Sequence, residues 1–136
     1  MARLGSADYD ALAAYRYLLR KFLRFSRDFL KRTANLNSEQ YEALLAIKAL
    51  PSEDGLTISN LSERLQIKHH SAVNIVDRLV ERKLVRRELG SRDRREKYLE
   101  LTAAGASLLE KLAAVHRKEM RSRSAEMIAA LKRLQK

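Results

Sequence analysis

The stretch that decides the fold is Leu84–Thr102, which reads LVRRELGSRDRREKYLELT. Two short runs rich in β-type residues flank the pair Gly90-Ser91. Four charged residues follow that pair at once: Arg92, Asp93, Arg94 and Arg95. The pattern predicts a β-hairpin with guanidinium groups at its tip. A tip of this kind suits the narrow, electronegative minor groove of DNA.

The residues before the hairpin predict two helices joined by a turn. Leu61 and Leu65 define a short helix, Gln66-Ile67-Lys68 the turn, and residues 69–83 a second helix. At about 100° per residue, one face of the second helix is apolar. It carries Ala72, Val73, Val76, Leu79 and Val80. The opposite face carries His70, Asn74, Asp77, Arg78 and Glu81, with Ser71 at its edge. Such a helix pair followed by a basic hairpin predicts a winged helix-turn-helix.

The candidate DNA contacts follow from how such a domain docks, with the start of its second helix against base edges in the major groove. On that helix they are His69, His70, Ser71, Asn74 and Arg78. In the hairpin, or wing, they are Arg92, Arg94, Arg95 and Lys97, with Asp93 pairing to hold the tip in shape. Asn74 suits bidentate recognition of adenine, and Arg78 suits guanine, a phosphate or an ion pair within the fold. Solvated surface charge is the alternative interpretation of the wing cations.

Helices are expected on both sides of this region. Residues 8–32 form a long amphipathic helix, and its apolar stripe is wide enough to indicate packing against a second subunit. Thr102 caps a later helix, which the polar stretch 117–123 continues or breaks, and Ser122 or Ser124 could cap a last helix. The expected dimer contacts are Leu12, Tyr15, Leu19, Phe22, Met127, Leu131 and Leu134.

The predicted fold class is therefore mainly α with a small β-hairpin, a winged helix-turn-helix with N- and C-terminal dimerisation helices. We expect one domain over residues 1–136. Its parts are an N-terminal dimerisation helix (8–35), the winged helix-turn-helix (37–101) and C-terminal dimerisation helices (102–136).

Composition narrows the class of function. The 136 residues carry a formal net charge of +11, which points to a polyanionic partner. The chain has no cysteine, which excludes disulfides and cysteine-bound zinc. Neither a nucleophile elbow nor a phosphate-binding glycine loop occurs, so we expect no enzyme and no cofactor. Without an apolar run of bilayer length or a signal-peptide-like start, we expect a cytoplasmic protein with no membrane partner.

The chain resembles the multiple-antibiotic-resistance-regulator (MarR) family of winged helix-turn-helix transcription factors. The resemblance rests on LSERL (61–65), VDRLV (76–80), Leu84-Val85, the wing RDRR (92–95) and LTAAG (101–105). It implies a dimer on a near-palindromic operator in double-stranded DNA, which a small aromatic or anionic effector often releases. Three positions depart from the family pattern. Gly90 replaces an aspartate, Lys83 replaces a glycine, and the second helix begins with His69-His70-Ser71.

His116 leaves two interpretations open. It is either a partly exposed surface or interface histidine, or it lines an effector cleft with Tyr41 or Arg27. For the whole chain, the expected function is a homodimeric, sequence-specific transcriptional regulator, a repressor released by a small molecule. The alternative is a basic architectural or adaptor protein that binds nucleic acid without reading its sequence. The hydrogen-bonding face at Ser71 and Asn74 favours the regulator, because purely electrostatic binding does not need it.

Overall fold

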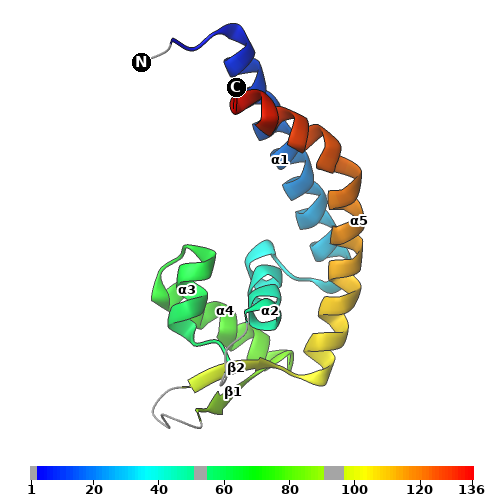
Figure 1. The fold of residues 1–136 in the computed structure, drawn as a ribbon. Helices are drawn as coiled ribbons and strands as arrows, with labels where there is room; N and C mark the ends of the chain where they lie inside the picture. Colours follow the sequence, from blue (N-terminus) through cyan, green and yellow to red (C-terminus); the bar gives the residue numbers. More distant parts are fainter. Residues whose placement is uncertain (1–2, 51–54, 91–96) are drawn as a thin grey trace.

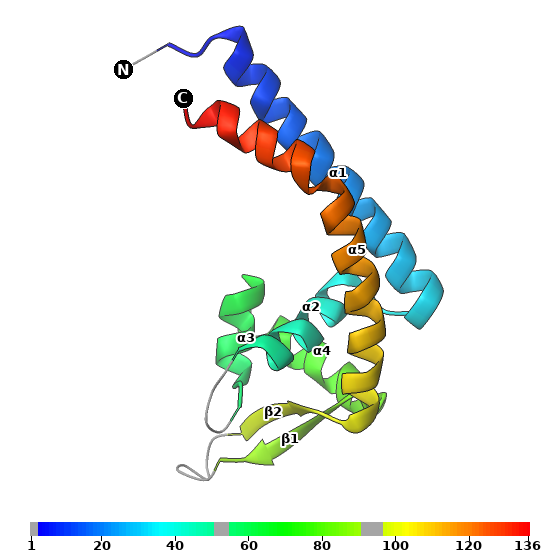
Figure 2. The ribbon, with the colours of Figure 1, turned by 45° about the vertical axis from the view of Figure 1, so that its right-hand side comes forward.

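The computed structural model describes residues 3–50, 55–90 and 97–136 (Figure 1). The described elements are α1 (Ser6–Ala34), α2 (Ser38–Ala49), α3 (Ile58–Leu65), α4 (His69–Glu81), β1 (Val85–Leu89), β2 (Lys97–Leu101) and α5 (Ala103–Leu134). Helices α2 to α4 and the β-hairpin form a winged body, from which α1 and the end of α5 extend as an arm (Figures 1 and 2). The predicted fold class, mainly helical with a small hairpin, is confirmed.

The wing is an antiparallel hairpin whose register runs from the pair Val85–Leu101 to the pair Leu89–Lys97. Leu56 adds an isolated bridge, because its carbonyl accepts a 2.8 Å hydrogen bond from the amide of Leu99. Thr57, directly after the bridge, caps α3, so this short segment connects the sheet to the helix.

Side-chain caps explain where α2 and α3 begin. Asn37 accepts from the amide of Gln40 at the start of α2, and Thr57 accepts from the amide of Asn60 at the start of α3. Each cap satisfies an amide that has no partner within its helix. The core that these helices enclose is aliphatic, and its completely or almost completely buried members include Leu44, Leu61, Val76, Leu79, Leu99 and Leu112.

A tight junction joins the end of helix α4 to the start of α5. Lys83 adopts a left-handed backbone conformation (φ 61°), so α4 ends at Glu81 rather than at Lys83 as the sequence pattern suggested. The Thr102 hydroxyl donates to the Lys83 carbonyl (2.7 Å) and accepts from the Gly105 amide (3.0 Å). The Thr102 amide donates to the Leu84 carbonyl at 3.1 Å. The wing, α4 and α5 therefore meet in one hydrogen-bonded unit.

The arm consists of α1 and the second half of α5, which lie side by side and bring the two chain ends to the same tip (Figure 2). The expectation of more than one C-terminal helix is wrong, because α5 is a single helix of 32 residues. The hydroxyls of Ser122 and Ser124 donate to the carbonyls of Glu119 and Arg121 within the helix instead of capping a new one. An ion pair between Arg123 and Glu119 (2.7 Å) further supports the polar stretch.

Candidate nucleic-acid interface and effector cleft

Helix α4 separates its buried and exposed faces as the sequence pattern predicted. Ala72, Val76 and Leu79 are buried in the core. Of the predicted contact residues, His69, His70, Asn74 and Arg78 are exposed, and Ser71 is half-buried. The structure therefore brings these five side chains to the first three turns of one helix.

Arg78 has a rival role as an ion-pair partner inside the fold, and the described residues do not support it. The adjacent Asp77 forms its ion pair with Arg87 of β1. No acidic partner of Arg78 occurs in the described ranges, so its guanidinium stays available on the exposed face beside Asn74.

The start of α4 adds a positive potential. Its N-cap residue, Lys68, makes no side-chain cap hydrogen bond, and no acidic residue lies in the first turn. The amides of Ser71 and Ala72 close turns onto the Lys68 carbonyl. The positive end of the helix dipole therefore remains free of carboxylates, and this favours an anion near His69 and His70.

Ion pairs anchor the base of the wing. Arg86 contacts Glu88 and the cross-strand Glu100, both at 2.8 Å, and Arg87 pairs with Asp77 of α4. The two arginines at the hairpin base are therefore committed to carboxylates within the fold. The second pair also connects the wing to helix α4.

The tip of the wing carries most of the predicted cations. Arg92, Asp93, Arg94 and Arg95 lie outside the described residues. Lys97, the last of the predicted wing contacts, is exposed at the first position of β2. Because β2 is anchored at its other end, the backbone position of Lys97 is fixed. Its side chain extends from the exposed side of the hairpin.

His116 is buried on α5, so its interpretation as a partly exposed histidine is wrong. Its Nδ1 lies 2.7 Å from the Leu112 carbonyl, and its Nε2 lies 2.8 Å from the Ser26 hydroxyl of α1. Because a carbonyl can only accept, Nδ1 carries a proton, and in the neutral ring Nε2 accepts from Ser26. Tyr41 of α2 stacks on the imidazole at 4.3 Å, and Phe29 meets it edge-on at 5.6 Å.

A cavity of about 350 Å³ opens beside His116 where α1, α2 and α5 meet. Its lining includes Phe22 and Ser26 of α1, Tyr41 and Glu42 of α2, and His116, Arg117 and Met120 of α5. Of the predicted cleft residues, Tyr41 and His116 line this space, whereas Arg27 is exposed on α1 and is not part of the lining. Ser26 could have been found from the sequence, because it is a polar residue within the apolar stripe of α1. Arg117 and Glu42 gave no such signal.

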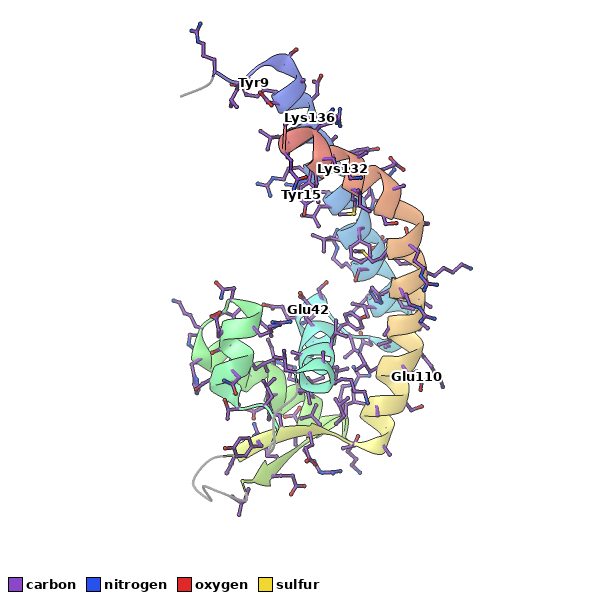
Figure 3. All side chains as sticks on the ribbon, viewed as in Figure 1. Tyr9, Tyr15, Glu42, Glu110, Lys132 and Lys136 are labelled. Atoms are coloured by element: carbon purple, nitrogen blue, oxygen red, sulfur yellow. The ribbon has the colours of Figure 1, made fainter. Side chains whose placement is uncertain are left out.

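The cavity mixes aromatic surface with a few polar groups. Burial raises the pKa of the Tyr41 phenol, and the charge of Glu42 raises it further. Tyr41 therefore keeps its proton at neutral pH and can donate a hydrogen bond. Burial also raises the pKa of Glu42, with a further contribution from Glu39. Figure 3 places Glu42 at the end of α2 that faces the arm.

The arm leaves part of its predicted dimer surface uncovered. Leu12, Leu131 and Leu134 are 46%, 45% and 36% exposed, respectively. The other four predicted dimer residues, Tyr15, Leu19, Phe22 and Met127, are half-buried. Figure 3 shows that Tyr9 and Tyr15 of α1 lie along the same part of the arm as Lys132 of α5 and the C-terminal Lys136. Packing of α1 on α5 therefore covers part of the stripe within one chain.

Two classes of site are not supported by the described residues. No helix within them is both long and apolar enough to cross a membrane. The same ranges contain no group of three His, Asp or Glu side chains that could hold a metal ion.

Known proteins share parts of this sequence and this architecture. The chain is 35% identical over 77 residues to the HTH-type transcriptional regulator PetP of Rhodobacter capsulatus, a match that covers 57% of this chain and 46% of PetP. The chain thus spans about half the length of that relative. Two solved structures share the fold. MepR, a regulator of the Staphylococcus aureus multidrug efflux pump MepA, matches with a TM-score of 0.75 at 19% identity, over 89% of this chain and 93% of MepR. AbsC of Streptomyces coelicolor, a MarR family transcriptional regulator, matches with a TM-score of 0.74 at 21% identity, over 90% and 82%.

The family match falls on the winged body. Residues 34–96, from the end of α1 to the residue before β2, match the MarR family model. This segment contains the helix pair α3–α4 and the first strand of the wing. Over this segment the chain is similar to the MarR family.

Proposed function

We propose that this chain is a homodimeric, sequence-specific DNA-binding transcriptional regulator that acts in the cytoplasm as a repressor. The observation that carries the proposal is the exposed face of α4. There Asn74 and Arg78 lie on the side opposite the buried core residues Val76 and Leu79. Both side chains can contact a base edge through two hydrogen bonds, so they offer the chemistry that sequence recognition requires.

The DNA contacts divide into two kinds. His70, Ser71 and Asn74 contact base edges and nearby phosphates in the major groove, and the cations of the wing contact the flanking minor groove. The uncapped start of α4 and the net charge of +11 favour the phosphate backbone at any sequence. The related MepR has been crystallised in a complex with DNA, at 22% identity to this chain.

The dimer forms through the arms. Leu12 of α1 and Leu131 and Leu134 of α5 are apolar side chains that one chain leaves exposed. Burying them against a second copy removes this surface from water. A two-fold dimer then presents two recognition helices to two half-sites of a near-palindromic operator.

The effector binds in the cavity beside His116. Its volume of about 350 Å³ suits a small aromatic molecule. Tyr41 and His116 provide a flat aromatic wall, and the Arg117 guanidinium provides a partner for an anionic group. Because the lining comes from both the arm and the winged body, a bound molecule favours one arrangement of the two over another. It thereby shifts the population away from the DNA-binding state.

Selection of duplexes from a random pool tests the proposal. At roughly physiological salt we expect enrichment of an inverted repeat whose half-sites lie about one helical turn apart. Asn74→Ala should reduce the discrimination between the selected sequence and random DNA, whereas Arg94→Ala should weaken binding to both. Retention of DNA without enrichment would instead support the alternative, a basic architectural protein. If Asn74→Ala lowered the affinity for the selected and the random duplex equally, Asn74 would have no role in sequence recognition.

The effector is tested separately, by thermal melting with a panel of phenolic acids. We expect at least one to raise the melting temperature and to lower affinity for the selected duplex. Arg117→Met, which removes the cation from the cavity lining, should weaken that effect, whereas Arg121→Met on the exposed side of α5 should not. No stabilisation across the panel would count against a ligand-responsive regulator.

A further inference from the structure

One side chain ties the end of the recognition helix to the end of the arm helix. Arg82 directly follows α4, and its guanidinium donates two hydrogen bonds to carbonyls at the C-terminal end of α1, those of Ala34 and the cap residue Asn35. Nη1 donates to the Asn35 carbonyl at 3.0 Å, and Nη2 donates to the Ala34 carbonyl at 2.8 Å. The contact therefore spans 47 residues of sequence and joins two helices with different roles.

The carbonyls that Arg82 contacts are suited to a cation. They lie at the C-terminus of a 29-residue helix, where the last carbonyls have no helical amide as a partner. The negative end of the helix dipole lies at the same place. Asn35 adopts a left-handed conformation (φ 52°), which turns the chain away from the helix axis beside these acceptors. The planar fork of a guanidinium fixes both the distance and the angle between the two elements.

Arg82 is also held at its own end. Its amide donates to the Arg78 carbonyl at 3.1 Å, and the next residue, Lys83, begins the junction with β1 and α5. A change in the angle between arm and winged body would pull this guanidinium away from α1. Because the guanidinium is engaged by α1, it is also not oriented as a phosphate contact.

We propose that Arg82 is a positioning residue that sets the angle of the recognition helix relative to the arm. In a dimer joined through its arms, this angle determines the separation of the two recognition helices. Arg82 thus determines which half-site spacing the protein accepts. This last step rests on the proposed function, whereas the link between α1 and α4 does not.

The angle can be measured in one chain without DNA. Because the chain has no cysteine, Arg16→Cys on α1 and Arg64→Cys on α3 introduce two exposed labelling sites. Spin-labelled chains mixed with excess unlabelled protein report a distance distribution within single chains. We expect Arg82→Met to broaden or shift this distribution and Arg82→Lys, which keeps the charge but loses the fork, to give an intermediate result.

Arg32→Met is the matched control, because Arg32 is an exposed arginine in the last turn of the same helix α1. It should leave the distribution unchanged. A distribution for Arg82→Met that superimposes on the wild type overturns the proposal. If circular dichroism shows that Arg82→Met is unfolded, the comparison of Arg82→Lys with Arg32→Met decides the question in the same way.

Binding to the selected duplex adds the functional readout. We expect Arg82→Met to lose about tenfold in affinity, which corresponds to about 1.4 kcal/mol, and to lose its preference among half-site spacings. The salt dependence should stay as steep as in the wild type. A slope reduced by about one with an unchanged spacing preference would identify a phosphate contact and overturn the proposal. If the wild type selects no sequence, the proposed function fails, and the distance measurement still tests the link.

Discussion

Replacing Gly105 by alanine should destabilise the chain strongly, although alanine is the better helix former. Gly105 is buried in the first turn of α5, against the backbone of Leu84 where the wing begins. A Cβ atom at this position would lie 2.0 Å from the Leu84 carbonyl oxygen and 2.9 Å from its carbonyl carbon. Both neighbours are backbone atoms, so no side-chain rotation can relieve the overlap.

The size of the effect follows from the shift that relief requires. Ordinary contact with the Leu84 oxygen needs α5 to retreat by about 1.4 Å. That movement breaks the two hydrogen bonds from Thr102 to the Lys83 and Leu84 carbonyls, at about 0.5–1.5 kcal/mol each. Strained packing adds about 1–3 kcal/mol, and the helix propensity of alanine returns about 1 kcal/mol. We expect the free energy of unfolding to fall by about 3 kcal/mol.

Urea unfolding followed by circular dichroism measures this loss. Because the proposed dimer would unfold with a concentration-dependent midpoint, all variants are compared at one chain concentration. Gly5→Ala is the matched control, since a Cβ at Gly5 meets nothing within 4 Å. It should change the free energy of unfolding by less than about 1 kcal/mol. A Gly105→Ala protein that is also within about 1 kcal/mol of the wild type would refute the packing argument.

Three further changes test other parts of the structure by the same urea measurement. Lys83→Gly should stabilise the chain by about 0.5–1 kcal/mol, because Lys83 holds a left-handed conformation that glycine adopts freely, and a loss of stability would contradict this. Glu42 has a raised pKa when folded, so its contribution to stability declines as pH rises from the ordinary carboxyl range through the raised value. Glu42→Gln should therefore flatten the decline in stability as pH rises above the ordinary carboxyl range, and an unchanged profile would exclude this effect. Asp77→Asn should lower stability by under about 1 kcal/mol, yet by more than Asp28→Asn, whose partner Arg24 lies 3.9 Å away on the exposed surface.

Local patterns carried enough information to predict the winged body. The alternation around Gly90 predicted the hairpin, and the 3.6-residue period predicted which side of α4 is buried. Thr102 could be predicted as a cap because its role depends on a residue only three positions away. The sequence singled out Lys83 because the family resemblance predicts a glycine at that position. The positive φ of Lys83 explains why a glycine suits it.

Features that depend on distant residues could not be predicted in this way. The burial of His116 depends on Ser26, which lies 90 residues earlier, and on Tyr41 from a third helix. The immediate neighbour Arg117 is a charged residue, which is typical of a protein surface. The local sequence therefore indicates an exposed position for His116, whereas His116 is buried. The continuity of α5 was hidden for a different reason. A helix in an arm needs only a narrow apolar face, so a polar stretch does not imply a break.

Because α5 is a single long helix, a small movement at its N-terminal end produces a larger movement at its C-terminal end. Thirty-two residues at 1.5 Å rise per residue span about 48 Å from the junction at Thr102 to the tip of the arm. A tilt of about 5° at the junction moves the far end by about 4 Å. A displacement smaller than a methyl group near the junction is thus amplified several-fold at the far end of the arm, where the exposed apolar residues Leu131 and Leu134 lie.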